Sequence, residues 1–68
     1  MKNKLKEYLR STIDDFDERA DLALSIIGRN RCSLEHADPA LAYEISDLAE
    51  EWCEENQIEM DFNLEDLL

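Results

Sequence analysis

Apolar side chains recur every three or four residues through the first 27 residues, and this period constrains the fold more than any other feature of the chain. Such a spacing places side chains on one face of an α-helix. Part of the series steps by four, three, four, three and four, which is the spacing of packed helices. The pattern predicts a long helix over about 3–27. Its apolar face consists of Leu5, Tyr8, Leu9, Ile13, Phe16, Ala20, Ala23, Leu24 and Ile27.

The extent of this first helix depends on two short segments. Residues 11–15 are rich in helix-capping types, and Asp15 stands three residues before Glu18, as in a capping box. The unbroken phase of the apolar face nevertheless favours one helix over two helices that meet at 11–15. Gly28 is expected to end the helix, because glycine adopts the left-handed C-terminal conformation without a steric penalty.

A second helix is expected over about 38–56. Asp38 is a favourable N-cap, and Pro39 suits the first helical position, where its missing N–H costs no hydrogen bond. Asn56 is expected to end the helix. Because only a short connection over 28–37 joins the two helices, they should lie antiparallel. The apolar face of the second helix consists of Leu41, Ile45, Leu48, Ala49, Trp52 and Cys53.

The period changes to two residues in the tail, which we define as residues 57–68. Apolar and polar residues alternate there, which is typical of an extended segment, and Asn63 is placed to cap a final helical turn. The sequence therefore predicts a single all-α domain over 1–68. Its architecture is a small antiparallel helical hairpin or three-helix bundle with an extended or short-helical C-terminal tail. The alternating apolar residues are Ile58, Met60, Phe62 and Leu64.

One turn of the first helix is apolar nearly all round. Leu22 and Ile26 lie beside the main apolar face, and a second helix covers only one side of that turn. Another element must therefore cover these two side chains. The tail, through Ile58, Met60 and Phe62, is one candidate. The others are a second copy of the chain in a homodimer and a partner protein.

Charge is segregated along the chain. Acidic residues number 18 against 7 Lys+Arg, and residues 37–68 contain 11 acids and no base. In an antiparallel hairpin the basic start, with Lys4, Lys6 and Arg10, is expected to lie beside the acidic end of the second helix. A net charge of −11 repels phosphates, which argues against direct binding to nucleic acid or to an anionic membrane.

Carboxylates are concentrated on the second helix at spacings that oppose helix stability. Like charges four residues apart, and anions near a helix C-terminus, are both unfavourable. Such a conflict between local preference and fold is typical of a surface that meets a partner. We therefore expect a non-catalytic interaction protein whose acidic face binds a basic protein surface, for example an inhibitor or DNA mimic from a phage or mobile element. The residues of this face are Asp47, Glu50, Glu51, Glu54 and Glu55.

The alternative is a self-associating structural domain. In that case Leu22, Ile26, Met60 and Phe62 form a dimer seam, and the acids only keep the protein in solution.

The sequence offers no pattern for catalysis, a cofactor or a metal site. The one His has no nucleophile and acid in a recognisable arrangement, and the one Gly excludes a glycine-rich phosphate loop. Cys32 and Cys53 are expected to be reduced thiols, since nothing in the sequence indicates export. No apolar run is long enough to span a bilayer, so we expect a cytoplasmic protein. Because no catalytic or ligand-binding pattern is present, we also expect no enzymatic activity, cofactor or metal.

Overall fold

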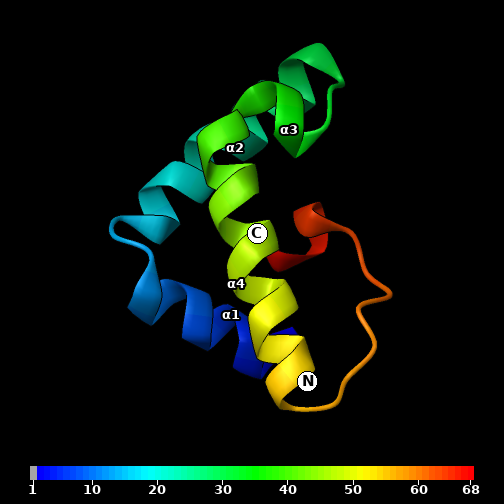
Figure 1. Ribbon diagram of the computed structural model, residues 1–68. Coiled ribbons are helices and arrows are strands. Elements are labelled where there is room, and N and C mark those ends of the chain that lie inside the picture. Colours follow the sequence, from blue (N-terminus) through cyan, green and yellow to red (C-terminus); the bar gives the residue numbers. More distant parts are fainter. Residues whose placement is uncertain (1) are drawn as a thin grey trace.

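The computed structural model describes the backbone of residues 2–68 and the side chains of residues 3–68, and it is all-α. In Figure 1, α2 rises along one side, α3 turns the chain, and α4 returns past α2 with α1 packed near its lower end. The predicted fold class, a small helical bundle with a C-terminal tail, is confirmed. The elements in chain order are α1 (Lys2–Thr12), α2 (Phe16–Asn30), α3 (Leu34–Ala37), α4 (Pro39–Glu55) and the 3-10 turn η1 (Leu64–Leu67).

The predicted single helix over 3–27 is wrong, because the chain breaks between α1 and α2. Asp15 adopts a left-handed backbone conformation with φ 54°. At the end of α1, the hydroxyl groups of Ser11 and Thr12 both donate to the carbonyl oxygen of Tyr8, at 2.9 and 2.8 Å. Such bonds compete with the helical ladder. The apolar phase conceals the break, since Ile13 and Phe16 on its two sides are both buried.

Gly28 does not end α2, contrary to expectation. The helix continues to Asn30, and Arg31 supplies the left-handed C-cap with φ 50°. The predicted connection over 28–37 is therefore shorter than expected and contains a helix of its own, α3. Leu34 at the start of α3 is fully buried, which explains why this segment is ordered against α2 and α4.

A Gly28→Ala substitution tests this placement of the helix end. Within a helix, alanine is favoured over glycine by about 1 kcal/mol, and a Cβ at Gly28 meets no atom within 4 Å. We therefore expect the substitution to raise the free energy of unfolding by about 1 kcal/mol in urea titrations followed by circular dichroism. A loss of stability of similar size would instead place Gly28 in the left-handed conformation that the sequence suggested.

The start and end of α4 follow the sequence prediction. The carboxylate of Asp38 accepts a hydrogen bond from the backbone N–H of Leu41 at 3.1 Å, and Pro39 occupies the first turn. Asn56 ends the helix, and its side-chain amide donates to the carbonyl oxygen of Trp52 at 2.8 Å. The buried side of α4 consists of Leu41, Ala42, Ile45, Ala49 and Cys53.

The tail folds back over the bundle, as the orange and red segment in Figure 1 shows. Its predicted alternation is confirmed, since Met60 and Phe62 pack against the core while Glu59, Asp61 and Asn63 are exposed. η1 packs against α1 and α4 with Leu67 at 0% exposure. A carboxylate oxygen of Glu65 accepts a hydrogen bond from the backbone N–H of Leu34 at 2.9 Å, which ties the tail to α3.

Candidate acidic interaction face

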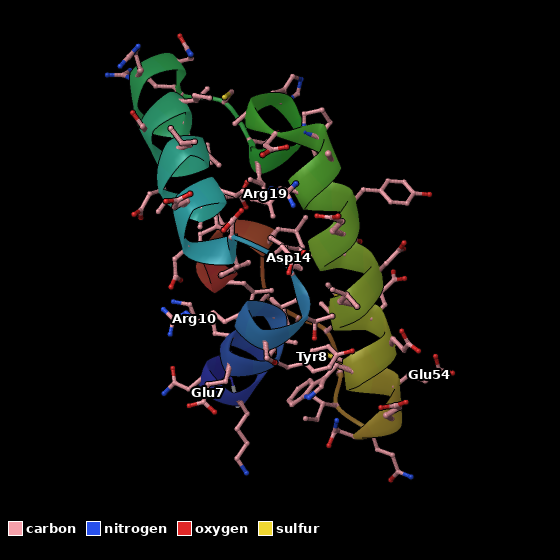
Figure 2. All side chains as sticks on the ribbon, turned by 90° about the vertical axis from the view of Figure 1, so that its left-hand side faces the viewer. Glu7, Tyr8, Arg10, Asp14, Arg19 and Glu54 are labelled. Carbon is pink, nitrogen blue, oxygen red and sulfur yellow. The ribbon has the colours of Figure 1, made fainter. Side chains whose placement is uncertain are left out.

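The candidate site is the acidic face of α4, formed by Asp47, Glu50, Glu51, Glu54 and Glu55, all of them exposed. Its position follows from the helix period. The residues of α4 that fill the core lie on one side, and at about 100° per residue these carboxylates fall on the opposite side. Figure 2 shows Glu54 projecting from α4 away from the other helices.

Tyr43 extends this face by one turn toward the start of α4. It lies four, seven and eleven residues before Asp47, Glu50 and Glu54, so these four side chains share one line along the helix. The Tyr43 side chain is 74% exposed, the largest exposure among the large hydrophobic residues of the described structure. Tyrosine is enriched where proteins bind other proteins. Sequence reasoning missed this residue, although its spacing from the acids was visible.

No described cation pairs with the acidic face. Arg10 donates to Asp17 at 3.0 Å and Arg19 to Glu44 at 2.6 Å, and these pairs lie outside the face. The expected pairing of Lys4, Lys6 and Arg10 with the end of α4 is therefore not found among the side chains of residues 3–68. The break after α1 explains why Arg10 does not reach α4: it brings the start of α2, with Asp17, within reach of the Arg10 side chain. In Figure 2, Arg10 and Glu54 project from opposite sides of the molecule.

A groove of about 380 Å³ adjoins the face where the break meets α4. Asp14 from the break and Asp47 from α4 contribute carboxylates to it, and the Arg19–Glu44 ion pair forms part of its wall. Figure 2 shows Asp14 and Arg19 between α2 and α4. The groove is open to solvent and combines three carboxylates with the Arg19 guanidinium. Among the described residues, Asp14 and Asp47 form no ion pair.

The structure does not bring the predicted seam of Leu22, Ile26, Met60 and Phe62 together. Met60 and Phe62 line a groove of about 290 Å³ beside α3 and Ser46 of α4. Leu22 is 68% exposed and Ile26 is 39% exposed. The tail, one of the candidates to cover the apolar turn of α2, therefore does not do so, because it packs against another side of the bundle.

Among the described residues, no three His, Cys, Asp or Glu side chains come together in a way that could hold a metal ion. His36 lies in α3, where its Nδ1 is 2.8 Å from the hydroxyl oxygen of Ser33. Cys32 is half-buried and Cys53 is buried, and both are free thiols. None of the helices described over residues 2–68 has the length and apolar character needed to cross a membrane.

No family model, curated protein or solved structure gives a significant match to this chain.

Proposed function

We propose that this protein is a non-catalytic binding module whose acidic face docks on a basic surface of a partner protein. One observation carries the proposal: all five carboxylates of the face are exposed and lie without a described cationic partner, and three of them, Asp47, Glu50 and Glu54, are in line with the exposed Tyr43. Electrostatic complementarity of this kind steers a partner and fixes its orientation. Tyr43 adds a large rigid contact at one end, which charge alone does not provide.

The spacing of the acids supports one form of this function, the occupation of a nucleic-acid-binding surface. Residues 47–55 span about 12 Å of helix axis from the first to the last of five carboxylates, which is an average spacing of roughly 3 Å between negative charges. Duplex DNA carries one charge per ~1.7 Å when both strands are counted, and ~3.4 Å when one strand is counted. The acidic face falls between these values, so an inhibitor or DNA mimic is the concrete version that we propose, and a phage or mobile element is the source that we expect for such an inhibitor. Free thiols are typical of the reducing cytoplasm, where we place this activity.

The test is a pull-down from an extract of the source cells with two variants of equal net charge. In one variant Glu50, Glu51, Glu54 and Glu55 are changed to Gln. In the control, four exposed acids outside α4 are neutralised: Glu7→Gln, Asp21→Asn, Glu59→Gln and Asp61→Asn. We expect the wild type and the control to capture the same protein, and the α4 variant to lose it.

Salt and competition identify the character of the contact. Surface charges are screened over about 8 Å at physiological ionic strength, so capture should weaken steadily as salt is raised above that level. Added duplex DNA should displace the captured protein if the acidic face occupies a nucleic-acid-binding surface. Capture that survives both high salt and neutralisation of the four α4 residues would contradict the proposal.

A further inference from the structure

α2 carries an exposed apolar pair that the rest of the described chain leaves uncovered. Leu22 and Ile26 are four residues apart on one flank of the helix, at 68% and 39% exposure. The tail, which was one candidate to cover them, lies against α1 and α4 instead. Exposed side chains of this kind stabilise a complex when a partner removes them from water.

The charges around this pair indicate which partner fits. Glu18 lies one turn before Leu22, and Arg29 lies about one turn after Ile26, on the same exposed stripe. When two α2 helices lie antiparallel about a two-fold axis near residue 24, Glu18 of each copy stands opposite Arg29 of the other. Leu22 of each copy then stands opposite Ile26 of the other. This reciprocity is what a two-fold symmetric interface requires.

We propose that two copies of this protein associate through antiparallel α2 helices, in a register that pairs Glu18 with Arg29 across the interface. The inference is independent of the proposed function, because the stripe lies on α2 and the acidic face lies on α4. A parallel pairing would place the acidic starts of both helices together, including Asp17 and Glu18 of each. Association through Tyr43 would likewise bring two acidic faces into contact. The antiparallel α2 pairing is the arrangement that places opposite charges together.

The size of the interface sets the expected strength. A helix of 15 residues is about 22 Å long, so two of them bury less area than a standard tight complex. The dimer should therefore dissociate on dilution. Sedimentation velocity over a concentration series, from low micromolar to millimolar at physiological ionic strength, should show a shift from monomer to dimer. A monomer at every concentration would overturn the proposal.

Two serine substitutions on α2 provide a matched test of the apolar contact. Ile26 is 39% exposed on the proposed stripe, and Leu24 is 41% exposed on the opposite flank of the helix. Ile26→Ser should weaken dimerisation by about tenfold or more, since the contact occurs twice in a symmetric dimer. Leu24→Ser should leave dimerisation close to that of the wild type. Equal weakening by both would overturn the proposed stripe.

A charge exchange tests the register. Glu18→Arg or Arg29→Glu alone places like charges opposite each other and should weaken dimerisation, whereas the double variant should restore it. The two residues are eleven apart and do not contact each other within one helix. Each change places a charge at the end of α2 where the helix dipole disfavours it. If the changes acted only through folding, the double variant would therefore dimerise less than either single variant. Failure of the double variant to recover dimerisation, while circular dichroism shows it folded, would overturn this register.

Discussion

Replacing Leu67 with alanine is expected to lower the free energy of unfolding by about 2–5 kcal/mol, the usual cost for a fully buried leucine. Leu67 is 0% exposed in η1, which packs against both α1 and α4. A domain of 68 residues has a total stability of roughly 3–10 kcal/mol, so the variant should be partly unfolded near physiological temperature. Urea denaturation followed by circular dichroism measures the loss directly.

Leu68 provides the matched control, because it is an adjacent leucine that is only half-buried. Leu68→Ala should cost clearly less than Leu67→Ala, since less apolar area leaves water when Leu68 packs. If neither variant lost more than about 0.5 kcal/mol, the tail would not be part of the core. Equal larger losses would contradict the difference in burial between Leu67 and Leu68. The result therefore decides whether residues 57–68 belong to the folded domain or only lie against it.

The parts of the fold that the sequence predicted are those encoded by local period and capping. α4 begins at Asp38 and Pro39 and ends at Asn56, as expected from residues whose preferences depend on a single helix end. The alternation in the tail was also visible, because a period of two residues survives in an extended segment whatever it packs against.

The break between α1 and α2 could not be predicted from the period. Ile13 and Phe16 remain buried on either side of a bend at Asp15, so the apolar series continues in phase while the helix axis changes direction. α3 is held by contacts between distant parts of the chain: Leu34 is buried against the bundle, and its backbone N–H donates to the carboxylate of Glu65. The capping types at residues 11–15 allow a break but do not decide for it against the continuous period, and no local pattern in the sequence indicates the contact between Leu34 and Glu65.

The sequence predicted that the acidic face is exposed. It did not predict which residues surround that face, since the expected pairing with the basic start of α1 is not found among the described side chains. Exposure of the acidic face follows from the period of α4 alone. Its lack of described cationic neighbours depends on the direction of α1, which the bend at Asp15 sets and which places Arg10 beside Asp17. The same bend forms the groove that joins Asp14 to Asp47. The sequence therefore predicted most of the helical segments, but not how α1 is placed relative to α2 and α4.

Neutralising the end of the acidic face is expected to stabilise the protein. Asp47/Glu51, Glu50/Glu54 and Glu51/Glu55 are like-charge pairs four residues apart, each costing roughly 0.2–0.5 kcal/mol. The last two acids also lie at the helix C-terminus, where the dipole disfavours anions. Changing Glu50, Glu51, Glu54 and Glu55 to Gln should raise the free energy of unfolding by about 1–2 kcal/mol, measured in urea.

The control variant with Glu7, Asp21, Glu59 and Asp61 neutralised undergoes the same change in net charge and should gain less stability. If the two variants gained equal free energy of unfolding, the stabilisation would come from the lower net charge of the protein and not from the removal of neighbouring carboxylates on α4. A larger gain for the α4 variant, together with its loss of partner capture, would show that this surface opposes folding and serves binding. Proteins lose stability at their functional sites for this reason, since groups arranged for a partner are poorly satisfied without it. The acidic face would then be a surface whose charges are compensated only in the complex.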